Sequence, residues 1–215
     1  MPRSTSRTAA KPPPVLVKAD ARPGRPPVTS RAELEHVALN LFWENGFDET
    51  TIDDIALACG IGRRTFFRYF SSKNDVPWGG FTEELDRLAA DLAATPARVP
   101  LLDAIRKGIL KFNRVDPQEL PWHRKRMSLI LKSDTLRAHS TLQYEHWVAV
   151  IAEYAAARLG HDPLGLVPRT IGYSALGACL VGYQTWLREP GSDLLELLDQ
   201  ALSLLLSGFA DIEST

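Results

Sequence analysis

The side chains best suited to chemistry are cations between residues 62 and 73, where Arg63, Arg64, Arg68 and Lys73 occur without an acidic residue. A guanidinium can donate two hydrogen bonds to one guanine, and an ammonium can bind a phosphate. This concentration of positive charge is typical of a surface that meets nucleic acid. The alternative is that arginines on a short exposed helix are simply hydrated.

Position along a helix divides these side chains into two predicted roles. Arg63 and Arg64 fall in the first turn of a helix expected from Gly62 to Phe70, and this turn reaches base edges when a helix lies in the major groove. We therefore predict that both arginines read bases. The predicted phosphate contacts, made by charged or hydroxyl side chains or by a helix N-terminus, are Thr51, Thr65, Arg68, Tyr69 and Lys73.

Two short helices and a tight turn must position these residues. Thr51 is a favourable N-cap, and Asp54 follows three residues later as in a capping box, so a helix is predicted to begin at Ile52. Gly60 supplies the positive φ at which this helix can end. The second helix then starts from Gly62, and the arrangement is that of a helix-turn-helix.

A family resemblance rests on the run DDIALACGIGRRTFFRYFSSKNDV and on Gly46, Phe47 and the Thr50-Thr51 pair before it. Over about residues 31–76 it resembles the DNA-binding signature of TetR-family transcriptional regulators. The segment GIGRRTFFRYFSSKNDVPWG resembles, more narrowly, the mycofactocin-system regulators of that family. The resemblance implies a dimeric DNA-binding protein with a ligand pocket.

The sequence departs from the family's common pattern at three positions. Gly62 replaces a small polar cap, Arg64 replaces a small residue, and Phe67 replaces a tyrosine. In relatives the tyrosine hydroxyl contacts a phosphate, so this contact is not carried over to Phe67. The pair of changes predicts one phosphate contact fewer and one more cation near the bases.

Length and composition describe a globular protein. With 215 residues, of which 45% are hydrophobic, the chain can bury a substantial core. No apolar run approaches the roughly 20 residues of a membrane span, and the N-terminus lacks the apolar core of a signal peptide. We expect a cytoplasmic protein with no membrane partner.

Charge is distributed unevenly along the chain. The formal net charge is -1, yet residues 1–31 contain seven cations and one acid. Residues 1–28 also hold seven of the 15 prolines, so they are predicted to be a disordered, basic, proline-rich arm. The arm is either a solvated tail or an additional DNA contact, and the segment RPGRPP favours the second interpretation.

Residues 29–75 are predicted to form a three-helix DNA-binding domain. Thr29 or Ser30 caps its first helix, and Gly46 closes it. The apolar stripe of this helix, which must pack behind the two motif helices, comprises Leu34, Val37, Ala38, Leu41 and Phe42.

Residues 76–215 are predicted to form a larger helical ligand-binding and dimerisation domain. A helix starting near Lys73 is expected to link the domains, with a break at residues 77–80, and any ligand signal is expected to reach DNA through it. The predicted fold is all-α. Apolar periodicity and breakers place the later helices at about residues 100–115, 117–133, 135–159, 164–189 and 192–210.

The last two predicted helices carry more apolar surface than one buried face can use. Gly172, Gly177 and Gly182 allow another helix to approach the first of them closely. One interpretation is an intramolecular helical hairpin. The other, favoured by the TetR resemblance and by the need for two half-sites, is a homodimer through residues 164–210.

Residues 121–132, PWHRKRMSLILK, combine cations with apolar side chains and suit an amphipathic anion. The TetR resemblance implies a pocket within the C-terminal helices, and the mycofactocin subgroup makes an acyl-coenzyme A (acyl-CoA) the candidate effector. Its phosphates would meet Arg124, Lys125 or Arg126. The alternative is a solvated charge run on a surface helix. The predicted ligand-binding residues are Phe112, Trp122, Arg124, Arg126, Met127, Trp147 and Tyr183.

No catalytic, metal or cofactor site is predicted. His139 and His146 lie two turns apart on one predicted helix, which is insufficient for a metal site. Residues 144–146 are consecutive, so a helix points their side chains in different directions, and no activated nucleophile accompanies them. Cys59 and Cys179 are predicted to be small buried residues rather than a disulfide.

The function predicted from sequence is a ligand-responsive, dimeric transcriptional repressor that is not an enzyme. It binds a near-palindromic double-stranded DNA operator and is released by a small-molecule effector. The alternative from another class is a helical acyl-group-binding protein or enzyme in which the helix-turn-helix is incidental.

Overall fold

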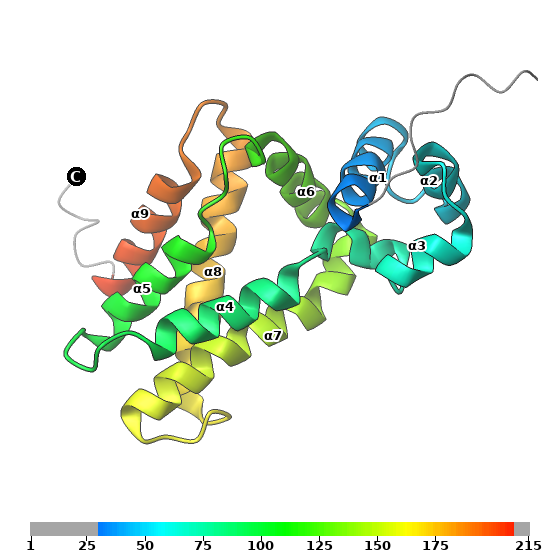
Figure 1. Ribbon diagram of the computed structural model, residues 1–215. Coiled ribbons are helices and arrows are strands. Elements are labelled where there is room, and N and C mark those ends of the chain that lie inside the picture. Colours follow the sequence, from blue (N-terminus) through cyan, green and yellow to red (C-terminus); the bar gives the residue numbers. More distant parts are fainter. Residues whose placement is uncertain (1–29, 209–215) are drawn as a thin grey trace, which may run out of the picture.

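The computed structural model describes residues 30–208 (Figure 1). The arm predicted at residues 1–28 lies outside this part of the chain. Every element of the described part is helical, which confirms the all-α prediction. The elements are α1 (Arg31–Asn45), α2 (Ile52–Cys59), α3 (Arg63–Tyr69), the 3-10 helix η1 (Lys73–Trp78), α4 (Phe81–Ala93), α5 (Leu101–Phe112), α6 (Leu120–Lys132), α7 (Asp134–Leu159), α8 (Leu166–Arg188) and α9 (Leu194–Leu206).

Helices α1, α2 and α3 form a small domain at one end of the molecule (Figure 1). Ser30 caps α1 and Thr51 caps α2, each through a capping box with the acid three residues later. Gly60 adopts the left-handed conformation, with φ 66°, which ends α2 and turns the chain toward α3. The predicted helix-turn-helix is confirmed.

One hydrophobic cluster holds the small domain together. Leu34 of α1, Ile55 of α2 and Phe66 of α3 have no exposed surface and pack in this cluster. Val76 of η1 and Leu136 of α7 are also fully buried in it. The larger domain is therefore anchored in the core of the small one.

The segment after α3 differs from the predicted α-helix. Lys73–Trp78 form a 3-10 helix, and α4 begins only after Gly80, whose φ is 75°. Pro77 lacks an N–H and disfavours the α conformation of Val76 before it, so a continuous α-helix cannot form here. The predicted break is confirmed, and the helix that precedes it is short and of the 3-10 type.

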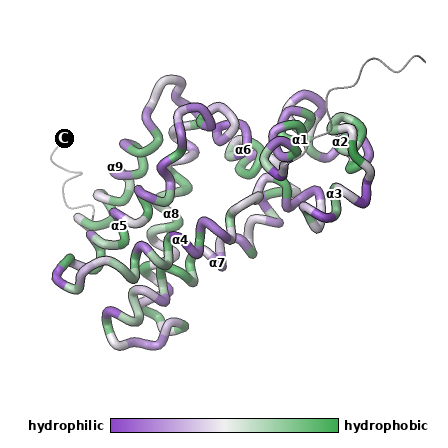
Figure 2. The backbone as a smooth tube through the Cα atoms, viewed as in Figure 1, coloured by the Kyte–Doolittle hydropathy of each residue, from purple (hydrophilic) through white to green (hydrophobic). Residues whose placement is uncertain are grey.

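Helices α4 to α9 form the larger domain. Figure 2 shows hydrophobic and hydrophilic residues interleaved along them, as expected when each helix buries one face. Within residues 30–208, no helix is both long and apolar enough to cross a membrane. Cys179 lies in the core of this domain and Cys59 in the core of the small domain, so both are buried as predicted.

Helix α6 provides a second connection between the domains, beside the chain's own path through α4. It packs against α1 (Figure 1). The Lys125 ammonium donates to Asn40 Oδ1 at 2.7 Å, and the Arg126 guanidinium donates to the Glu35 carboxylate. The linking helix is therefore not the only connection between the domains among the described residues, because polar side chains of α6 have their partners on α1.

Helices α8 and α9 form a hairpin in which two of the three predicted glycines allow close approach. A Cβ at Gly172 would lie 2.9 Å from the Val148 side chain of α7, and one at Gly182 would lie 2.9 Å from the Leu198 side chain of α9. Gly177 has no neighbour within 4 Å of such an atom. Its side of α8 therefore faces away from the rest of the described chain.

Candidate functional site

The recognition-helix candidate α3 presents its cations on an open surface. Arg63, Arg64 and Arg68 are exposed, whereas Thr65 is half-buried. Gly62 precedes the helix in an extended conformation and makes no side-chain cap, as its lack of a side chain requires. Phe67 is 45% exposed, so its ring adds apolar surface to this face.

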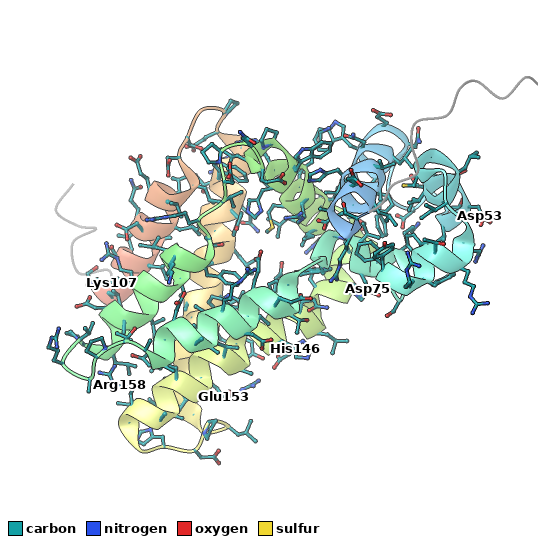
Figure 3. The ribbon with its side chains drawn as sticks, viewed as in Figure 1. Asp53, Asp75, Lys107, His146, Glu153 and Arg158 are labelled. Atoms are coloured by element: carbon teal, nitrogen blue, oxygen red, sulfur yellow. The ribbon has the colours of Figure 1, made fainter. Side chains whose placement is uncertain are left out.

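The two predicted base-reading arginines differ in their partners. Arg63 Nη1 donates to both carboxylate oxygens of Asp53 on α2, at 3.1 and 3.0 Å; Figure 3 shows Asp53 on the small domain. No hydrogen bond or ion pair to Arg64 is found within residues 30–208. Arg64 can therefore meet DNA without giving up a contact, whereas Arg63 must leave an exposed ion pair of modest value.

Hydroxyl groups predicted to bind phosphate already take part in local structure. Thr51 Oγ1 accepts from the Asp54 N–H at 3.1 Å and donates to the Asp54 carboxylate at 2.6 Å. The Asp54 carboxylate also accepts from the Thr51 backbone N–H at 2.9 Å, and the bonds that it accepts from the Thr51 hydroxyl and N–H lower its pKa. Arg68 Nη2 donates to the Tyr69 hydroxyl at 3.1 Å, which places both side chains on one edge of α3.

Lys73 is held by the backbone of the small domain. Its ammonium donates to the carbonyls of Phe47, Asp48 and Thr50 at 2.7, 3.3 and 2.9 Å and lies 4.5 Å from the centre of the Phe47 ring. These three bonds use all three ammonium hydrogens. The phosphate contact of Lys73 stays a prediction, and the geometry gives the residue a structural role in fixing the loop between α1 and α2.

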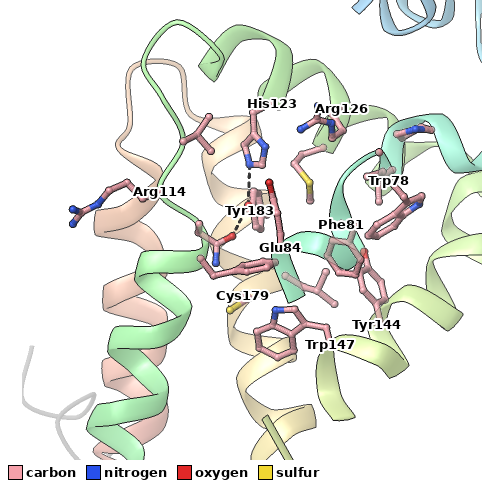
Figure 4. A pocket seen from close by; sticks show the side chains of 18 of the residues that line it. Trp78, Phe81, Glu84, Arg114, His123, Arg126, Tyr144, Trp147, Cys179 and Tyr183 are labelled. Carbon is pink, nitrogen blue, oxygen red and sulfur yellow. Dashed lines mark hydrogen bonds between the residues drawn. The ribbon is translucent and has the colours of Figure 1, made fainter. Parts of the chain in front are cut away.

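A cavity of about 360 Å³ lies inside the larger domain (Figure 4). Its walls come from η1, α4, α5, α6, α7 and α8. Its lining includes apolar side chains, among them Phe81, Trp147 and Leu176, and polar ones, among them His123 and Glu84. The predicted ligand-binding residues that line it are Phe112, Arg126, Met127, Trp147 and Tyr183.

Trp122 and Arg124 were predicted in the same set but lie on other faces of α6. The Trp122 ring stacks on His36 of α1. Arg124 Nη2 donates to the Trp186 carbonyl at 2.6 Å, near the C-terminal end of α8, and the guanidinium lies over the Trp186 ring. Consecutive helical residues point about 100° apart. The helix therefore sends these neighbouring side chains in different directions, and only some of them reach the cavity.

A hydrogen-bonded chain missed by the sequence prediction crosses the cavity wall (Figure 4). The Tyr183 hydroxyl donates to Asn113 Oδ1 at 2.7 Å and lies 2.9 Å from His123 Nε2. Asn113 Nδ2 donates to the Ile109 carbonyl at 2.8 Å, which fixes the amide orientation. Because the tyrosine proton points to Asn113, His123 Nε2 must be the donor to the Tyr183 oxygen.

Burial sets the protonation of this chain. Desolvation, with a smaller contribution from Arg126, lowers the pKa of His123 to about 4, so the imidazole is neutral. Burial also raises the pKa of the Tyr183 hydroxyl, and it raises that of the nearby Cys179 thiol to about 12. At neutral pH the wall therefore offers fixed hydrogen-bonding groups rather than a thiolate or phenolate nucleophile. Asn113 gave no sequence signal, since a lone asparagine at a helix end is ordinary.

The histidines of α7 lie in different surroundings. His139 Nε2 lies 3.0 Å from Asp75 Oδ1 of η1, whereas His146 is exposed further along the helix. Figure 3 labels both Asp75 and His146. Within the described residues, no group of three or more histidine, cysteine or acidic side chains is arranged to hold a metal ion.

Comparisons with known proteins cover both domains. Residues 36–76 match the family model of bacterial regulatory proteins of the tetR family, and residues 99–210 match the MftR C-terminal domain. A Mycobacterium tuberculosis protein named "Putative mycofactocin biosynthesis transcriptional regulator MftR" is 40% identical over 189 residues, covering 88% of this chain and 96% of that protein.

Solved structures share the fold. The FadR repressor of Thermus thermophilus, in complex with lauroyl-CoA, aligns with a TM-score of 0.53 and 24% identity over 83% of this chain and 94% of that chain. The FadR regulator of Bacillus subtilis, in complex with stearoyl-CoA, aligns with a TM-score of 0.58 and 18% identity over 83% of this chain and 99% of that chain.

A helix-turn-helix domain joined to a helical domain with an internal cavity defines a one-component transcriptional regulator. The chain belongs to the TetR family of these regulators, with a larger domain of the MftR C-terminal type.

Proposed function

We propose that this protein is a cytoplasmic, dimeric repressor that binds a near-palindromic operator and releases it when a small-molecule effector enters the cavity. The observation that carries this proposal is the position of α6. Arg126 lines the cavity and also bonds to α1, and the neighbouring Lys125 bonds to α1 as well. Occupancy of the cavity can therefore alter the seating of the small domain.

The proposed effector is an acyl-CoA thioester. Support comes from the cavity lining, which combines apolar and polar side chains and so suits an apolar chain that ends in a polar group. The two FadR structures in complex with lauroyl-CoA and stearoyl-CoA provide further support. A coupling free energy of about 1–3 kcal/mol between effector and operator is enough to weaken operator binding about 5- to 150-fold. No catalytic step is proposed.

The proposed dimer interface is the outer face of α8 and α9. Tyr173, Gly177 and Val181 repeat at helical spacing on α8, with Tyr173 42% and Val181 57% exposed. Leu204 of α9 is 43% exposed. A symmetric pairing of this face would cover apolar surface and bring two α3 helices to two half-sites.

An operator-binding assay tests this function. The full chain is titrated onto fluorescent DNA from upstream of its own coding sequence, with scrambled DNA as the control, and then lauroyl-CoA is added. We expect a specific complex that lauroyl-CoA dissociates. A chain that binds lauroyl-CoA but forms no specific DNA complex would instead support the helical acyl-group-binding protein or enzyme with an incidental motif.

A further inference from the structure

One side chain, Arg126, is shared between the cavity and the small domain. It lines the cavity, and its Nη2 donates to Oε1 of Glu35 on α1. Glu35 is only 6% exposed. Its other oxygen is confined by Gly79, because a Cβ at that glycine would lie 2.5 Å from Glu35 Oε2. The carboxylate therefore sits in a closed space in which Arg126 is its charged partner.

Two residues that line the cavity each carry a buried hydrogen-bond donor without a partner among the described residues. These donors are Arg126 Nε and the indole Nε1 of Trp78, the residue next to Gly79. A buried N–H that lacks an acceptor is unfavourable, and such groups normally find one. Because both unpaired groups are donors, a ligand group rich in acceptor oxygens would satisfy them once the side chains that cover them move aside.

Other polar groups of the cavity wall already have hydrogen-bond partners. His123, Tyr183 and Asn113 are joined to one another in a chain of hydrogen bonds. The Glu84 carboxyl also lines the cavity, and partial burial raises its pKa. Among the residues lining the apolar interior, Arg126 is the cation with an unused buried N–H.

The geometry of the Arg126 guanidinium determines how an anion can bind to it. Nε and Nη2 lie on the same edge of the guanidinium, and a carboxylate or phosphate binds that edge through two parallel hydrogen bonds. Glu35 occupies Nη2 alone while Nε is unused. A bidentate ligand anion must therefore compete with Glu35 for Arg126.

We propose that the anionic group of the effector binds Trp78 and Arg126 and displaces Glu35 from the guanidinium, which releases α1 from α6. This inference rests on the proposed ligand-responsive function and assigns its switch. The recognised ligand is an apolar chain that ends in an oxygen-rich anion, either a carboxylate or a phosphate. Displacement leaves Glu35 buried without its cation, and a shift of α1 that hydrates the carboxylate relieves this cost.

The test uses the full-length protein and three probes: lauroyl-CoA, laurate and uncharged dodecanol. Binding without DNA is measured by calorimetry, and operator affinity is measured by fluorescence anisotropy. We expect Arg126→Gln to weaken binding of the anionic probe by about tenfold. Dodecanol binding should stay unchanged, and this result would also show that the cavity of the variant is intact. Comparison of lauroyl-CoA with laurate identifies phosphate or carboxylate as the anion.

Glu35→Gln gives the opposite expectation. Loss of the competing charge should tighten binding of the anionic probe by about tenfold, leave dodecanol binding unchanged and weaken operator binding before any ligand is added. Lys125→Gln is the matched control, because Lys125 joins α6 to α1 without lining the cavity. It should weaken operator binding without changing the preference for the anion.

Distinct results overturn the two proposals. The exchange at Arg126 is wrong if Glu35→Gln weakens binding of the anionic probe. It is also wrong if the Arg126→Gln protein still binds the anionic probe more tightly than dodecanol by the same factor as the wild-type protein. Either result counts against the exchange even when the ligand still releases the operator. If the wild-type protein binds an anionic probe but keeps its operator, the ligand-responsive function fails while the anion preference stands. If no probe binds, both proposals fail.

Discussion

The rings of His36 and Trp122 are stacked across the boundary between the two domains, with centroids 4.2 Å apart and planes within 8° of parallel. His36 belongs to α1 and Trp122 to α6. His36 Nε2 also lies 3.0 Å from Glu119 Oε2, and Glu119 lines the cavity. The stack therefore joins the small domain to a segment that borders the proposed ligand.

Replacing Trp122 should change the coupling between lauroyl-CoA and operator binding more than it changes lauroyl-CoA affinity. Trp122→Ala removes the stack, and stacked aromatic pairs contribute about 0.5–1.5 kcal/mol. Since Trp122 does not line the cavity, lauroyl-CoA affinity should change little. The coupling free energy, obtained from the operator affinities with and without lauroyl-CoA, should change by about 0.5–1.5 kcal/mol. Anisotropy and calorimetry on one preparation measure both quantities. A loss of ligand affinity alone would argue against a coupling role.

Arg64→Ala should relax base preference at one operator position, at a cost of about 1–3 kcal/mol. Arg64 is exposed and has no hydrogen bond or ion pair within the described residues, so it is available to a base edge. Arg63→Ala is the comparison, because Arg63 is paired with Asp53 and should show a smaller effect. Affinities for operators substituted one base pair at a time measure the difference. Uniform weakening by both variants would assign both arginines to phosphates.

Lys73→Met should destabilise the small domain and weaken every DNA sequence equally. The change removes a cation that donates to three carbonyls of the loop between α1 and α2, and a charged hydrogen bond is worth about 1.5–3 kcal/mol. Thermal unfolding and DNA titrations over a range of salt concentrations test this. We expect an unchanged salt slope, because the ammonium hydrogens are already used. A slope shallower by about one would support the phosphate contact predicted from the sequence.

Acid should destabilise the larger domain through His123. The pKa of His123 in the folded state is about 4, below the ordinary value of 6.5. Between these two values the His123 side chain binds a proton in the unfolded chain but stays neutral in the folded chain. This stabilisation is complete above pH 6.5 and is lost as the pH falls toward 4. Between pH 7 and 5 the group should cost about 2 kcal/mol. Urea unfolding at both pH values should show a smaller loss for His123→Gln, which keeps a donor but does not titrate.

The helix-turn-helix was predictable because its determinants are local. The Thr51–Asp54 capping box and the left-handed Gly60 depend on residues within one or two turns of each other. The partners of Lys73 were not predictable, because they are backbone carbonyls more than 20 residues away whose direction depends on the folded loop. The run PWHRKRMSLILK identified the right helix. It did not reveal that Arg124 and Arg126 reach different neighbours, since that depends on which helix packs on each side of α6.

The outer face of α8 offers the last prediction, a monomeric variant. Val181 is 57% exposed in the described chain and lies one turn from Gly177, where an added Cβ would meet nothing within 4 Å. Val181→Glu would place a carboxylate beside its symmetry mate if this face pairs, and burying unpaired like charges is unfavourable. We expect sedimentation to show monomers and operator affinity to fall. Leu57→Glu is the control for assembly, because Leu57 is 83% exposed on α2 of the small domain. Dimers that persist in Val181→Glu at micromolar concentration would place the interface elsewhere.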